Sequence, residues 1–176
     1  MLLKCFLQKI TTFLGRTRFA THVSASVVSS AIWRSVRSFD HVTIFGNHLF
    51  VGACLNALRV LKEEVPETFQ IINARVEFIA QSPGSGILHS RPVLIFLSTK
   101  MASLPTSELA GILAHEACHI SLEEGSLLSK EVEERRCIEY QCKILKELGV
   151  DQQVIAEVQE AIKTEYWKIP IFKRNW

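Results

Sequence analysis

The sequence has 176 residues, of which 48% are hydrophobic, and its formal net charge is +2 at pH 7. This length is typical of one domain, and the apolar content is enough to bury a core. The small charge, with no basic stripe interleaved with aromatic residues, argues against a nucleic-acid partner. The five cysteines are odd in number and include no CxxC pair, which argues against a disulfide framework and a zinc ribbon. We therefore expect an intracellular, reducing setting.

The N-terminal stretch has an unusual composition, because residues 1–38 contain no Asp or Glu but several Lys and Arg among many Ser and Thr. This composition is typical of an organelle transit peptide and equally compatible with an amphipathic helix or a flexible leader. We interpret residues 1–38 as a basic leader and residues 39–176 as the folded domain. The expected location is cytoplasmic, or organellar if the leader is a targeting signal. No transmembrane span is expected, since the longest uncharged stretch, residues 41–58, contains two Asn and two Gly.

Strands and one helix are predicted in the first half of this domain. Residues 41–45 form a short candidate strand, and residues 48–65 have apolar side chains at helical spacing up to a stop at Pro66. The second half of residues 69–80 is rich in β-branched and aromatic side chains, which favours a strand. The apolar run at residues 93–97 predicts a strand that is covered on both faces.

Three helices are predicted in the second half. The first runs from about residue 105 through residue 120, with a negative charge in its first turn that favours the helix dipole. The second covers residues 130–148 and is ended by Gly149. The third runs from Asp151, a plausible N-cap, to about residue 168.

The first of these helices contains the pentapeptide HEACH at residues 115–119, which matches the pattern H-E-x-x-H. Residues four apart share a helix face, so His115 and His119 can reach one ion, and neutral imidazole is a preferred zinc ligand. Glu116 is rotated by about 100° from His115, so it lies beside the ion and can act as general base. It is the only charged residue between 109 and 122 other than the histidines, and an unpaired carboxylate there would be costly. The motif therefore predicts a catalytic Zn²⁺ site; the less specific interpretation is a hydrogen-bonded core cluster.

A third ligand is needed, and the motif does not supply it. The metzincin extension fails, because Leu122 and Gly125 stand where its Gly and its third His would be. Several carboxylates follow in the sequence: Glu123, Glu124, Glu131, Glu133, Glu134 and Glu139. On the helix at 130–148, Glu134 falls near the centre of the apolar stripe and Glu131 near one edge, whereas Glu133 lies beyond the other edge. We predict Glu134 as the third ligand, with Glu131 as the alternative; an ion pair with a neighbouring arginine is the other interpretation of Glu134.

Two stretches resemble the gluzincins. Residues 109–119 (LAGILAHEACH) are similar to the active-site helix of that family, and residues 134–149, which begin ERRCIEYQC and end in a glycine, are similar to its glutamate helix. Together they resemble the minimal single-domain gluzincins and, more loosely, the soluble part of the prenyl-protein endopeptidases. The resemblance implies an α+β, zincin-like single domain in which a backing helix and a small mixed sheet support these two helices. Ile138 departs from the pattern, because an acid or amide there often orients a histidine ligand. Either another group orients the ligand, or the metal site is weaker than in the family.

The expected function is that of a zinc-dependent metallopeptidase acting on a peptide or protein substrate. Glu116 would accept a proton from a metal-activated water and later deliver it to the leaving amine. In related folds the strand at 93–97 is the sheet edge on which an extended peptide lies, but its apolar sequence is equally consistent with core burial. A further donor for the oxyanion could be Tyr140, Tyr166 or His89.

Two other functions are compatible with the sequence. One is a non-catalytic zinc-binding domain, in which Cys118, Cys137 or Cys142 completes a closed site of four protein ligands. The other is an inactive pseudo-peptidase that serves as an interaction domain. Zinc content combined with hydrolysis by the wild type and by Glu116→Gln distinguishes the three.

Overall fold

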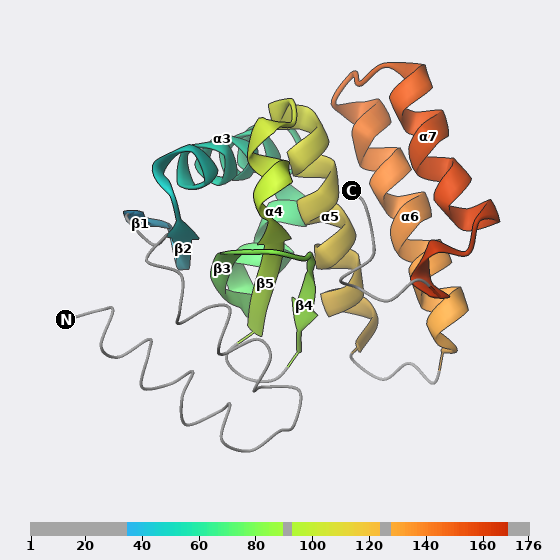
Figure 1. The fold of residues 1–176 in the computed structure, drawn as a ribbon, viewed down its shortest axis with the longest axis horizontal. Helices are drawn as coiled ribbons and strands as arrows, with labels where there is room; N and C mark the ends of the chain where they lie inside the picture. Colours follow the sequence, from blue (N-terminus) through green and yellow to red (C-terminus); the bar gives the residue numbers. More distant parts are fainter. Residues whose placement is uncertain (1–34, 90–92, 124–127, 169–176) are drawn as a thin grey trace.

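A five-stranded mixed sheet organises the chain in the computed structural model, which describes residues 35–89, 93–123 and 128–168 (Figure 1). The order of the strands is β1-β2-β3-β5-β4. Strands β2, β3 and β5 run parallel, and the outer strands β1 and β4 are antiparallel to their neighbours. The strands are β1 (Ser35–Phe39), β2 (Val42–Gly46), β3 (Val76–Ser82), β4 (Gly86–Leu88) and β5 (Val93–Ser98).

The strands predicted at 41–45, in the second half of 69–80 and at 93–97 are confirmed. The interpretation of the strand at 93–97 as a sheet edge is wrong, because β5 lies between β3 and β4. Its burial pattern is that of a core strand, as the other interpretation held. The edge next to β5 is β4, a three-residue strand too short to give a sequence pattern.

The described sheet begins at Ser35, where β1 pairs with β2 through Ser35 and Gly46. The last four residues of the predicted leader, 35–38, therefore belong to the folded domain. The rest of the predicted leader, residues 1–34, lies outside the described residues.

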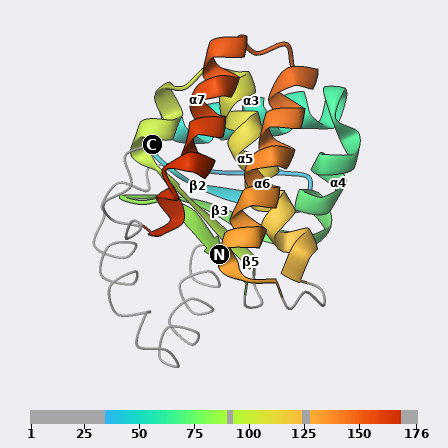
Figure 2. The same ribbon diagram turned by 90° about the vertical axis from the view of Figure 1, so that its right-hand side faces the viewer.

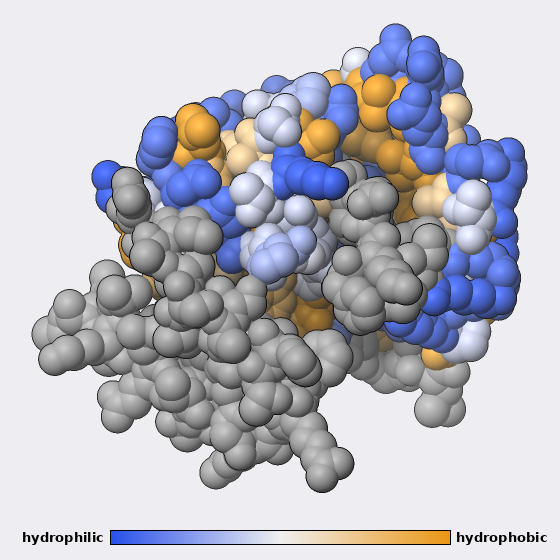
Figure 3. Space-filling model, viewed as in Figure 1, coloured by the Kyte–Doolittle hydropathy of each residue, from blue (hydrophilic) through white to orange (hydrophobic). Residues whose placement is uncertain are grey.

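Five α-helices are present in the described part of the chain, and three of them, α3, α4 and α5, lie on one side of the sheet (Figures 1 and 2). The helix α6 packs on α5, and α7 packs on α6, with polar side chains along the outer surface of α7 (Figure 3). The helices are α3 (His48–Glu64), α4 (Pro66–Arg75), α5 (Thr106–Glu123), α6 (Lys130–Glu147) and α7 (Gln152–Lys163), with short 3-10 helices η1 (Thr99–Ser103) and η2 (Tyr166–Lys168).

The predicted helices at 48–65, 105–120 and 130–148 are confirmed. The third predicted helix of the second half ends earlier than expected, at Lys163, because Glu165 has a positive φ of 47° and breaks the helix before η2. The helix α4 is absent from the predicted elements, because Pro66 also fits the interpretation as the end of the preceding helix. Proline also fits the first turn of a helix, where no intrahelical N–H bond is needed, and Pro66 starts α4 in this way.

The main core lies between the sheet and the helices. Ile44, Ile79 and Ile95 are register partners on the three parallel strands and are fully buried. They belong to one apolar cluster with Phe50 of α3 and Leu113 of α5. Burial of each such side chain contributes about 1.5–3 kcal/mol, so this cluster fixes α5 firmly on the sheet. The α+β class with a small mixed sheet is confirmed, and no helix in the described residues is both long and apolar enough to cross a membrane.

Candidate metal centre

The histidines of the HEACH segment lie on the side of α5 that faces α6. On its other side α5 is anchored in the main core by apolar residues that include Leu109 and Leu113. His115 and His119 are one helical turn apart, and both are buried, with 6% and 8% of their surface exposed. The sheet-facing side chains therefore set the direction in which the two imidazoles point.

The glutamates come from the start of α6. Ser129 caps this helix by accepting a hydrogen bond from the backbone N–H of Val132 at 3.4 Å. The cap starts the helix so that Glu133 and Glu134 fall within its first five residues, where the helix dipole favours negative charge. Glu134 is 6% exposed and faces α5.

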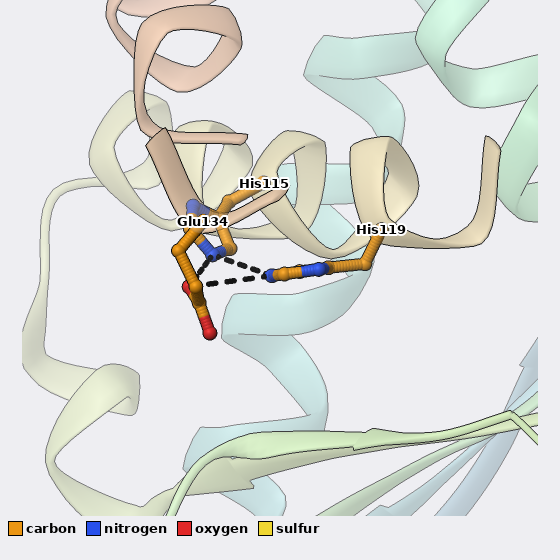
Figure 4. A group of neighbouring side chains, drawn as sticks. All are labelled: His115, His119 and Glu134. Atoms are coloured by element: carbon orange, nitrogen blue, oxygen red, sulfur yellow. Dashed lines mark hydrogen bonds and ion pairs between the residues drawn. The ribbon is translucent and has the colours of Figure 1, made fainter. Parts of the chain in front are cut away.

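Three donor atoms converge on one point between α5 and α6 (Figure 4). The Nε2 atoms of His115 and His119 are 3.0 Å apart. Glu134 Oε2 lies 3.6 Å from Nε2 of His115 and 3.5 Å from Nε2 of His119. Three atoms bound tetrahedrally to one ion at about 2.0–2.1 Å would be separated by about 3.3 Å. The spacing and chemistry of this buried His115–His119–Glu134 group therefore fit a metal ion.

The Nδ1 atoms of His115 and His119, which lie on the ring edges away from the donor group, have different surroundings. Nδ1 of His119 is 2.7 Å from Oε1 of Glu133, which is a charge-assisted contact of short length. Nδ1 of His115 is buried and has no hydrogen-bond partner among the described residues. The contact between Glu133 and His119 was not predicted, because Glu133 lies off the apolar stripe of its own helix.

The electrostatics of the group follow from burial and from mutual contacts. Burial alone would lower the pKa of His119, but Glu134, Glu116 and Glu133 outweigh it and raise the pKa to about 9. Burial alone would raise the pKa of Glu134, but contacts with His115 and His119 hold it well below its usual range. In the metal-free group, His119 is thus a cation facing an ionised Glu134.

Glu116 is buried beside the donor group, with 7% of its surface exposed. Burial raises the pKa of its carboxyl, and the nearby histidines His115, His119 and His89 oppose the rise. A carboxyl with a raised pKa is a stronger proton acceptor once it is ionised. The side chain can therefore exchange a proton next to the point where the donors meet.

The other candidate carboxylates do not join the group. Glu131, the alternative third ligand, is exposed and pairs with Arg135 at 3.6 Å. Glu139 is also exposed. The side chain of Glu123 and the whole of Glu124 lie outside the described residues.

The cysteines considered for a closed zinc site are absent from the donor group found in the described residues. The thiols of Cys118 and Cys137 contact each other across the α5–α6 interface, which lowers the pKa of Cys118 and raises that of Cys137. The thiol of Cys142 faces the backbone oxygen of Ile155 in α7 at 4.0 Å. The arrangement therefore does not favour the closed cysteine site.

The three candidate oxyanion donors differ in how the structure places them relative to the donor group. The hydroxyl of Tyr140 is 2.7 Å from the hydroxyl of the fully buried Thr68 on α4, so it is engaged in helix packing. The side chain of Tyr166 lies outside the described residues. His89 directly follows β4 and is among the residues that oppose the rise in the pKa of Glu116, so it is the candidate that the structure brings toward the site.

Comparison with known proteins finds no matching family model, no matching curated protein and no matching solved structure. The geometry of this site and the sequence motif within it are therefore the features that bear on function.

Proposed function

We propose that this chain is a zinc-dependent metallopeptidase, with His115, His119 and Glu134 as zinc ligands and Glu116 as general base. The observation that carries the proposal is the convergence of three buried donors, 3.0–3.6 Å apart, beside a fourth buried ionisable group. Two imidazoles and one carboxylate are a known donor set of catalytic zinc, and three protein ligands leave one position open. Glu116 and Glu134 are both buried, and burying two carboxylates in one site is costly unless a cation balances them. The resemblance to the minimal gluzincins supports the same proposal, including a zincin-like fold.

The chemistry divides between the ion and the chain. When bound, zinc would polarise the substrate carbonyl and make a water molecule acidic near neutral pH. Glu116 would accept the proton of the attacking water and transfer it to the leaving amine. His89 would donate a hydrogen bond to the negative charge that develops on the carbonyl oxygen.

The substrate we propose is an extended peptide that adds to the edge strand β4. This strand pairs with β5 on one side and ends the strand order on the other. An extended peptide adds to such an edge through main-chain hydrogen bonds. His89 follows β4 and opposes the rise in the pKa of Glu116. A peptide bound along this edge would therefore lead toward the donor group.

Hydrolysis of a quenched fluorescent peptide library by the zinc-loaded protein tests the proposal. We expect cleavage by the wild type, loss of cleavage on chelation, and recovery when zinc is returned. Glu116→Gln should bind zinc as the wild type does but lose hydrolysis, and Glu131→Gln, on the exposed side of α6, is the matched control that should keep both. A zinc-loaded wild type that cleaves no peptide would overturn the enzymatic proposal and favour an interaction domain.

A further inference from the structure

The imidazole of His119 is held between two consecutive glutamates of α6. Its Nε2 faces Oε2 of Glu134 at 3.5 Å, and its Nδ1 faces Oε1 of Glu133 at 2.7 Å. Consecutive residues on a helix point in directions about 100° apart, so their carboxylates can reach opposite edges of one ring. Glu133 is partly exposed, with 28% of its side-chain surface accessible, and it is not part of the donor group.

This contact determines which nitrogen of His119 is available to an ion. A neutral imidazole carries one proton, and a carboxylate accepts a hydrogen bond but cannot donate one when ionised. With Glu133 accepting from Nδ1–H, the lone pair of Nε2 is directed at the point where His115 and Glu134 converge. The same hydrogen bond holds the ring plane in place.

Ile138, which stands where the gluzincins often have an acid or amide that orients a histidine ligand, is an apolar packing residue in this chain. Ile138 is 1% exposed and packs with Ile155 of α7 and Trp167 of η2. The residue thus belongs to the contact that holds α7 on α6, and an acid there would be buried among apolar side chains. A group that orients a histidine ligand therefore has to come from another position.

We infer that Glu133 is the positioning residue of the metal centre, which fixes the tautomer and the ring orientation of His119 and so increases the affinity for zinc. The inference rests on the proposed zinc site. His115 has no equivalent support, because its buried Nδ1 has no hydrogen-bond partner among the described residues. The affinity should therefore depend strongly on this single carboxylate.

The test measures zinc dissociation constants by competition with a chelating dye between pH 7 and 10, which separates proton competition at His119 from intrinsic affinity, for the wild type, Glu133→Ala, Glu133→Gln and Glu131→Ala. Loss of a carboxylate that orients a metal ligand typically weakens binding by roughly 10- to 100-fold, and we expect this for Glu133→Ala. Glu133→Gln keeps an oxygen that can accept from Nδ1–H, so it should lie between Glu133→Ala and the wild type. Glu131→Ala removes the same charge two residues earlier on α6 and should bind zinc as the wild type does.

The visible absorption of the Co²⁺-substituted proteins provides a second readout that a purely structural role of Glu133 would not change. We expect the bands of Glu133→Ala to differ from those of the wild type and of Glu131→Ala. Equal zinc affinities and equal Co²⁺ spectra for Glu133→Ala and Glu131→Ala would overturn the inference. If the inference about Glu133 fails but the wild type hydrolyses peptides, the proposed function still stands. If the wild type binds zinc but hydrolyses no peptide, the proposed peptidase function fails and the inference about Glu133 still stands.

Discussion

Gly111 on α5 lies so close to Leu145 on α6 that a methyl group at Gly111 would overlap the leucine side chain. Gly111 is one turn before His115 on the same helix face, and α6 runs antiparallel to α5, as the contact between His119 and Glu133 at the other end shows. This glycine therefore sets the separation of the two helices that carry the three donors.

Gly111→Ala should push α6 away from α5 and weaken the metal centre. Overpacking of this kind typically costs about 1–3 kcal/mol of unfolding free energy. Urea denaturation and zinc titration measure the two effects. The control is Gly52→Ala in α3, where an added Cβ meets nothing within 4 Å and should stabilise the helix by about 0.5–1 kcal/mol. Unchanged stability and zinc affinity in Gly111→Ala would show that the close approach is unimportant.

Zinc binding should release a proton from His119. The pKa of this imidazole is raised to about 9 in the metal-free protein, and the ion binds only the neutral form. The apparent zinc affinity should therefore rise by roughly tenfold per pH unit between pH 7 and about 9 and then level off. Calorimetry in buffers of different ionisation enthalpy counts the protons. Affinity that is constant over this range would contradict the raised pKa.

The same shift affects the stability of the metal-free protein. The pKa of His119 in the folded protein lies above the ordinary value of 6.5, so protonation of His119 stabilises the fold. This stabilisation is fully present below pH 6.5. This contribution is lost as the pH rises through about 9. Denaturation of the metal-free protein at pH 6 and pH 10, compared with the same pair of measurements on His119→Gln, isolates the effect. A decline of equal size in both proteins would assign it to other groups.

His89→Ala should lower kcat and leave zinc content and KM nearly unchanged. Removal of one donor to a developing oxyanion typically costs about 100- to 1000-fold in kcat. His41→Ala, an exposed histidine that follows β1, is the control and should have wild-type kinetics. If His89→Ala instead raises KM alone, His89 contacts the substrate without acting on the reaction.

Tyr140→Phe should affect stability and not catalysis. The change removes the hydroxyl that contacts Thr68 at 2.7 Å and leaves a fully buried threonine hydroxyl without this partner, which costs about 1–3 kcal/mol. Thermal denaturation measures the loss, and kcat should match that of the wild type. A fall in kcat without a change in stability would return Tyr140 to the list of oxyanion donors.

The placement of Glu134 could be predicted from the sequence because its side chain belongs to the buried stripe of its own helix, and periodicity reports that stripe directly. The contact of Glu133 with His119 could not be predicted in this way. It depends on how α5 and α6 cross, and the crossing is set by contacts such as that of Gly111 with Leu145. A pattern within one helix carries no information about that angle.

The sheet also shows that a pattern within one element does not predict how that element packs with others. The apolar run of β5 predicted a covered strand correctly, but its position in the sheet depends on whether another strand pairs outside it. The three residues of β4 are too few to show alternation, so the true edge was not recognisable. At Pro66 the ambiguity was chemical, since proline is compatible both with the residue after a helix and with the first turn of the next one.

The zinc content of the purified protein and of Glu134→Gln, determined by mass spectrometry after removal of free metal, tests the central claim most directly. We expect one zinc ion per chain in the wild type and in the Glu131→Gln control, and a large loss in Glu134→Gln. Equal zinc content in Glu134→Gln and the wild type, or a wild type that binds none, would contradict a metal centre built from His115, His119 and Glu134.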